Sequence, residues 1–163
     1  MNPSVDHLSL ALFLLRIILG VIFFAHGAQK VFGWFGGYGF TGTVGYFKNV
    51  VHVPTPLAYL GPFVEFVGGI ALALGVFTKF AALGILVMML VATLKVHLSS
   101  GFFLSGKGDG KSQGYEYSLT LAVISLVLVL FGGGIYSIDS LIYYNGRTPD
   151  QSHHGGTFSR SRV

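Results

Sequence analysis

Cysteine is absent from this chain of 163 residues, and charged residues are scarce. Without thiols, the chain by itself cannot form a disulfide, a dithiol relay, an iron–sulfur cluster or a zinc–thiolate site. Charged residues make up 10% of the chain, whereas a soluble domain carries roughly 25%. Hydrophobic residues make up 52%, which is too much apolar surface for so few charges to cover in water. The composition therefore indicates a membrane protein.

Patterns typical of nucleic-acid, metal or nucleotide binding are also sparse. The formal net charge of +4 is spread along the chain without a basic stripe, so we expect no nucleic-acid partner. His153 and His154 stand alone in a polar tail, and we predict no metal site. Residues 110–112 (Gly-Lys-Ser) resemble part of a phosphate-binding loop. However, Ser105 stands where that loop needs its first glycine, and no predicted strand precedes it.

Four long apolar segments determine the predicted fold, because a helix needs roughly 20 residues to cross the hydrocarbon core of a bilayer. These segments are 8–32, 57–77, 80–98 and 116–135. The short turn at 78–79 predicts an antiparallel hairpin between the second and third helices. We therefore predict an all-α fold, an integral membrane bundle of four antiparallel helices in one domain, residues 1–144.

The segments outside the spans have distinct compositions. The first loop, 33–56, mixes glycines with aromatic residues, which are typical of the membrane interface. Its stretch 40–51 is predicted to form a short interfacial helix. The tail, 145–163, is polar and is predicted to be disordered.

Ionisable side chains interrupt the spans, and in lipid such groups need a partner or a polar cavity. Arg16 lies inside the first span and Glu65 inside the second. With a rise of about 1.5 Å per residue, they lie roughly 12 Å from the opposite ends of two antiparallel helices, and so near the same depth. We predict that they form an ion pair, because pairing lowers the cost of burying either charge.

A second group of polar residues lies nearer the outer ends of the spans. His26 and Lys30 are four residues apart and share a face of the first helix. We predict one polar pocket that opens outward and receives side chains from all four helices, with Arg16 and Glu65 at its floor. The candidate ligand-binding or proton-relay residues are Arg16, His26, Lys30, Glu65, Lys95, His97, Tyr115 and Glu116.

Structural interpretations stay open for the same residues. The two lysines and Glu116 lie near span ends, where long side chains can reach the headgroups. The predicted Arg16–Glu65 pair could serve only to hold two helices together. The two histidines could be interior residues with satisfied hydrogen bonds.

Several short motifs resemble those of the DoxX family of small membrane proteins. In the first span they are Leu15-Arg16, Gly20, His26-Gly27 and Lys30. In the second span they are Glu65, Gly68-Gly69 and Gly75. In the later half they are His97, Gly101-Phe102-Phe103, Glu116, the glycines at 132–134 and Ser137-Ile138-Asp139. The resemblance implies a four-helix, multi-pass protein of the bacterial cytoplasmic membrane. The family is named after a subunit associated with an archaeal quinol oxidase and thiosulfate:quinone oxidoreductase system.

We therefore expect a membrane subunit of a redox-related complex, whose pocket binds a quinone-like or small anionic ligand. The chain encodes no redox centre, so quinone is the expected cofactor and a redox partner protein the expected electron source. Membrane lipid and further copies of the chain are the other expected partners. Any enzymatic role would be that of part of an oxidoreductase complex. Two alternatives stay open: a scaffold or assembly factor without chemistry, and a small proton-coupled transporter, a role that buried acids and histidines also suit.

The distribution of lysine and arginine in the flanks predicts that both termini lie in the cytoplasm. The cytoplasmic side would then hold Lys79, Arg147, Arg160 and Arg162. The outer side would hold Lys48, Lys107 and Lys111. A reporter that is active only in the cytoplasm should give signal when fused to the C-terminus, and one active only outside should not. The reverse pattern would contradict this orientation.

Overall fold

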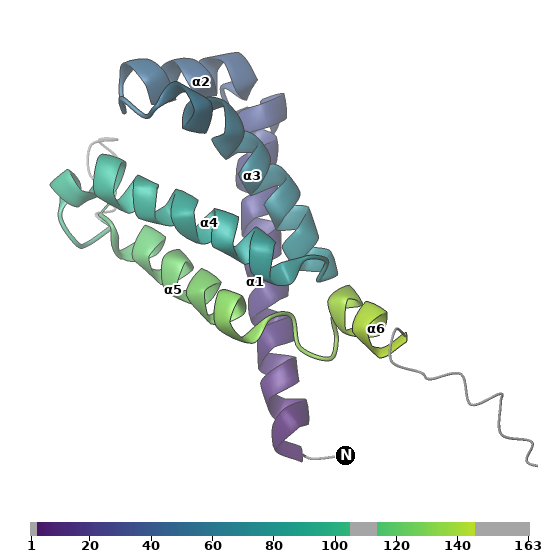
Figure 1. The fold of residues 1–163 in the computed structure, drawn as a ribbon. Helices are drawn as coiled ribbons and strands as arrows, with labels where there is room; N and C mark the ends of the chain where they lie inside the picture. Colours follow the sequence, from purple (N-terminus) through teal and green to yellow (C-terminus); the bar gives the residue numbers. More distant parts are fainter. Residues whose placement is uncertain (1–2, 105–113, 146–163) are drawn as a thin grey trace, which may run out of the picture.

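A computed structural model describes residues 3–104 and 114–145, and its regular elements are helices (Figure 1). The main helices are α1 (Pro3–Phe32), α2 (Gly39–Asn49), α3 (Thr55–Leu74), α4 (Thr78–Ala92), α5 (Glu116–Phe131) and α6 (Ile138–Asn145). Short turns are the 3-10 turn Trp34–Gly36, the π-helical turn η2 (Thr93–His97) and the 3-10 turn Leu98–Ser100. The all-α prediction is confirmed. The tail at 146–163 and the glycine-rich residues 105–113 lie outside the described residues.

Three helical stretches are long and apolar enough to cross a membrane: Val5–Phe32, Thr55–Leu74 and Thr78–Ser100. The fourth predicted span corresponds to α5, which is apolar but has only 16 residues. Large apolar side chains cover the outward faces of all these helices. Such a surface suits contact with lipid and would be unfavourable in water. Examples of these side chains are Ile18, Val21, Leu60, Val67, Leu83, Val123 and Leu130.

The helix boundaries differ from the predicted spans at identifiable places. α3 ends at Leu74 because Gly75 adopts a left-handed conformation with φ of 73° and closes the helix as its C-cap. Helix α2 occupies the stretch that was predicted to be a short helix. Helix α6 was not predicted from the sequence; it starts at Ile138, just beyond the last predicted span.

The closest packing in the bundle is between α1 and α3, where glycines bring the two backbones together. A Cβ atom on Gly20 would lie 2.7 Å from the backbone N of Ala73. A Cβ on Gly69 would likewise clash with the backbone of Phe24, and one on Gly27 with that of Phe66. Small residues of this kind allow helices to approach closely in lipid, where the hydrophobic effect does not drive them together.

The other helices are arranged around this pair (Figure 1). α4 and α5 pack against each other, and α4 also packs against α3. α2 contacts α1 and α3 at the end where α1 finishes. α6 lies toward the opposite end, beside the turn between α3 and α4, where the Asp139 backbone N donates to the Gly75 carbonyl. The two ends of the bundle therefore differ: α2 packs against one end, and α6 lies beside the other.

We expect Gly69→Ala to destabilise the bundle by about 1–3 kcal/mol, because its Cβ would meet backbone atoms that cannot move aside. Thermal unfolding of the purified protein in mild detergent measures the effect as a lower melting temperature. Gly45→Ala on α2 is the matched control, since a Cβ there meets nothing within 4 Å. Equal melting temperatures for the two variants would contradict close packing of α1 on α3.

Candidate functional site

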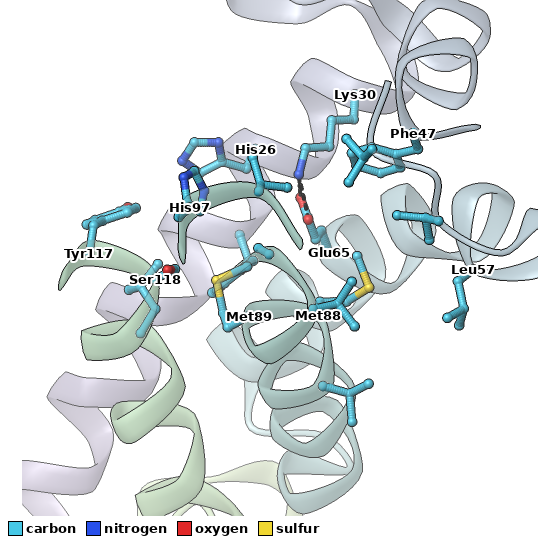
Figure 2. A pocket seen from close by; sticks show the side chains of 18 of the residues that line it. His26, Lys30, Phe47, Leu57, Glu65, Met88, Met89, His97, Tyr117 and Ser118 are labelled. Atoms are coloured by element: carbon cyan, nitrogen blue, oxygen red, sulfur yellow. Dashed lines mark hydrogen bonds and ion pairs between the residues drawn. The ribbon is translucent and has the colours of Figure 1, made fainter. Parts of the chain in front are cut away.

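A buried ion pair between Lys30 of α1 and Glu65 of α3 forms the centre of the site (Figure 2). The ammonium of Lys30 contacts both carboxylate oxygens of Glu65. The Glu65 side chain is 2% exposed, whereas that of Lys30 is 25% exposed. The ring of Phe47, from α2, lies with its centroid 5.8 Å from the Lys30 ammonium. A carboxylate this deeply buried needs such a partner.

The predicted Arg16–Glu65 pair is therefore wrong, and the register of α1 against α3 explains why. At the close contacts of these antiparallel helices the two residue numbers add to 93, as for Gly20 with Ala73 and Gly27 with Phe66. This register places Arg16 opposite position 77, twelve residues or about 18 Å along the helix from Glu65. Counting depth from the ends of the predicted spans could not reveal this offset.

Arg16 instead binds the segment between α5 and α6. It is 1% exposed, and its Nη2 donates to the carbonyl oxygen of Tyr136 at 2.8 Å. A Cβ on Gly75 would overlap the guanidinium, so the two are packed together. Nearby, the carboxylate of Asp139 accepts hydrogen bonds from the backbone N–H groups of Phe77 and Thr78, at 2.7 and 2.8 Å. These contacts attach the start of α6 to the rest of the bundle.

The Lys30–Glu65 pair lines a cavity of about 260 Å³, which we call the inner pocket. Its polar lining residues are His26, Lys30, Tyr46, Glu65, His97, Tyr117 and Ser118. Figure 2 labels all of these except Tyr46. Its apolar lining includes Phe23, Phe47, Leu57, Val87, Met88, Met89 and Leu121. In Figure 2 both imidazoles lie at the same end of the pocket, and the two methionines lie below the ion pair. The pocket thus combines an extensive apolar wall with a few polar groups.

The end of α4 is wound as a π-helical turn where it lines the inner pocket, and π-turns are frequent at functional sites. Thr93 begins this turn, and its Oγ1 lies 2.8 Å both from the carbonyl oxygen of Met89 and from Oγ of Ser118 on α5. The contact holds η2 against α5. His97, at the end of the turn, lines the pocket, while Lys95 does not and is exposed.

The structure brings four of the eight candidate residues together at the pocket: His26, Lys30, Glu65 and His97. The other four, Arg16, Lys95, Tyr115 and Glu116, do not line it. Glu116 Oε1 accepts a hydrogen bond from the backbone N of Leu104 at 2.7 Å, and the Tyr115 ring packs edge-on against Phe102. Both residues therefore connect the start of α5 to residues 102–104.

Sequence reasoning missed three polar residues that line the pocket, Tyr46, Tyr117 and Ser118. For Ser118 a signal was available. Ser118 and Ser125 stand seven residues apart, which places them on one face of a helix. The structure buries that face, which consists of Ser118, Leu121, Ala122, Ser125 and Leu128. For Tyr46 and Tyr117 we find no corresponding signal in the sequence.

Fully buried apolar side chains separate the inner pocket from Arg16. They are Leu19 on α1, Leu72 on α3, Ile85 on α4 and Leu128 on α5. On each helix the residue lies between the part that lines the pocket and the end nearest α6. Within the described residues, the two polar regions of the bundle are therefore separated by a packed apolar layer.

Comparison with known proteins identifies a family and two relatives. The DoxX family model matches residues 11–98, which include His26, Lys30, Glu65 and His97. A protein of Bacillus subtilis (strain 168) named "Putative oxidoreductase CatD" is 27% identical over 143 residues, covering 88% of this chain and 92% of its own length. An "Uncharacterized protein" of Haemophilus influenzae (strain ATCC 51907 / DSM 11121 / KW20 / Rd) is 29% identical over 141 residues, 81% of this chain and 83% of its own length. No solved structure gives a significant match.

The unequal exposure of the ion pair predicts unequal effects of removing its two members. Lys30→Met should lower the free energy of unfolding by about 3 kcal/mol, because it leaves the Glu65 carboxylate buried and unpaired. Glu65→Gln should cost less, because the partly exposed ammonium can turn toward water. Thermal unfolding in detergent ranks the two variants. An equal or reversed ranking would show that the carboxylate is not the more deeply buried charge.

Proposed function

Because this chain belongs to the DoxX family and its helices suit a membrane, we propose that it is the membrane subunit of a redox complex, with an inner pocket that binds the ring of a quinone-like molecule. The observation that carries this proposal is the lining of the pocket, which is mostly apolar with a few polar groups. A small-molecule site has this composition, with the polar groups orienting the ligand. The name of the Bacillus subtilis relative supports a redox role.

The size of the inner pocket supports a ring as the ligand. Sites for drug-sized ligands have volumes of about 300–1,000 Å³, and this pocket, at about 260 Å³, is slightly smaller. Leu57 of α3 and Val87 of α4 line the pocket and are 39% and 46% exposed. A ring could therefore occupy the pocket while an apolar chain attached to it passes between these residues into the lipid.

The charges in the pocket support a neutral ligand over a small anion. Lys30 already contacts both oxygens of Glu65, so its positive charge is balanced within the protein. A quinone is neutral, and its two carbonyl oxygens accept hydrogen bonds. His26, His97 and Tyr117 carry groups that can donate such bonds. Reduction of a quinone to a quinol takes two electrons and two protons; in this proposal a partner redox protein supplies the electrons and Glu65 passes on protons.

The transporter alternative receives less support from the geometry. The apolar layer of Leu19, Leu72, Ile85 and Leu128 separates the inner pocket from the end near α6. With both termini in the cytoplasm of a bacterium, the pocket would lie toward the outer side of the membrane. A scaffold without chemistry would have no use for the pocket, and the test below also addresses that alternative.

Two residues of η2 offer a matched test of ligand binding. His97→Ala should weaken the binding of ubiquinone-1 to the purified protein by about tenfold or more, which corresponds to about 1.4 kcal/mol. Lys95→Ala, two residues away and outside the pocket, should bind like the wild type. Equilibrium dialysis in mild detergent measures both affinities, and the melting temperatures without ligand confirm that the variants are folded.

Absence of ubiquinone-1 binding by the wild-type protein would overturn the proposal and favour the scaffold. If Lys95→Ala and His97→Ala weaken the binding of ubiquinone-1 equally, the ligand lies outside the inner pocket. Saturable binding of sulfate at the same site, without ubiquinone-1 binding, would favour a small anion as the ligand.

A further inference from the structure

A second cavity, which we call the vestibule, adjoins the inner pocket. Its volume is about 620 Å³, and its walls come from the end of α1, the turn that follows and α2. Three residues line both cavities: Lys30, Tyr46 and Phe47. Of these, Lys30 carries the positive charge of the buried ion pair. The vestibule and the inner pocket thus share Lys30, the cationic member of the ion pair, as part of their lining.

The vestibule, like the inner pocket, has a mainly apolar lining with a few polar groups. Its amide and hydroxyl side chains are those of Gln29, Tyr38, Thr43, Tyr46 and Asn49. Four glycines also line it: Gly36, Gly37, Gly42 and Gly45. A cavity needs about 10–15 Å³ and two to four polar partners to hold one water. The vestibule exceeds that volume many times over and offers such partners, so it is suited to hold water.

Lys30 lines the vestibule and also contacts the buried carboxylate. Glu65 lines the inner pocket but not the vestibule. Its side chain is 2% exposed and contacts the Lys30 ammonium, which is the more exposed partner. Along this side of the site, a proton that moves from vestibule water to Glu65 therefore reaches Lys30 first. The other titratable groups that line the inner pocket are His26 of α1, Tyr46 of α2, His97 of η2 and Tyr117 of α5.

We infer that the vestibule is the proton inlet of the inner pocket and that Lys30 relays each proton to Glu65. The Lys30 ammonium passes one proton to the Glu65 carboxylate, which leaves a neutral amine beside a neutral acid. The amine then takes one proton from vestibule water, so the net transfer is one proton to Glu65 and no electrons. This inference rests on the proposed function, in which a reduced ring takes its protons from Glu65. An amine suits the relay because, unlike a guanidinium, it can lose its proton.

Gly45 allows the vestibule to be filled without touching the inner pocket. It lies in α2, lines only the vestibule, and a Cβ added to it meets nothing within 4 Å. Gly45→Leu should therefore fold and occupy part of the cavity, while Gly45→Ala adds one methyl group and serves as the control. The readout that needs no ligand is acetylation of Lys30 by sulfosuccinimidyl acetate, a charged reagent that stays in water, measured by mass spectrometry.

We expect Gly45→Leu to slow acetylation of Lys30 strongly and to leave that of the exposed Lys48 unchanged, with Gly45→Ala behaving like the wild type. Equal acetylation of Lys30 in all three proteins would overturn the vestibule as its route to water. This arm does not depend on quinone binding, so its outcome is separate from that of the proposed function.

The second arm measures proton uptake after pulse-radiolytic reduction of bound ubiquinone-1, with a water-soluble pH indicator. Gly45→Leu should bind ubiquinone-1 like the wild type. Its rate of proton uptake should be lower by about tenfold or more, since a positioned proton-transfer group typically contributes at least this much. Lys30→Arg, which keeps a cation beside Glu65 but cannot release its proton, should show a similar loss per bound ubiquinone-1. Wild-type uptake rates in both variants would overturn the relay and leave ubiquinone-1 binding, and thus the proposed function, intact.

Discussion

The close approach of α1 and α3 at their glycines is the constraint on which the rest of the structure depends. Backbone atoms of the two helices meet at Gly20, Gly27 and Gly69, so neither helix can slide or turn without a steric clash. This contact places Lys30 beside Glu65 and moves Arg16 to the other end of the bundle. The positions of the glycines therefore determine the register of α1 against α3, and the register determines which two charged residues pair.

The two buried charges are accommodated differently at the two ends of the bundle. The carboxylate of Glu65 is neutralised by Lys30. The guanidinium of Arg16 donates from Nη2 to a carbonyl oxygen beside the start of α6, while its Nε and Nη1 have no hydrogen-bond partner among the described residues. Each contact also joins distant segments of the chain. The end under α2 differs because two cavities adjoin its ion pair, so a ligand there could meet the buried charge.

The candidate site could be predicted in part. Arg16 lies elsewhere because of the register of α1 against α3, whereas Lys95, Tyr115 and Glu116 stand where a helix changes form or begins. His26 and Lys30 stand one helical turn apart on a long regular helix, where spacing alone places them on one face. Lys95 and His97 stand in a π-helical turn, and Tyr115 and Glu116 at the start of α5. At such places the direction of a side chain depends on contacts such as that between Thr93 and Ser118, which join distant parts of the chain.

The sequence by itself determined that the chain is helical and suited to a membrane, because composition and the length of apolar segments are local properties. It also determined that the buried charges need partners, because the cost of a charge in an apolar medium does not depend on the fold. Only the tertiary structure decided which partners they have. Pairing depends on the register between two helices, and that register follows from backbone contacts between residues about forty to fifty positions apart in the chain.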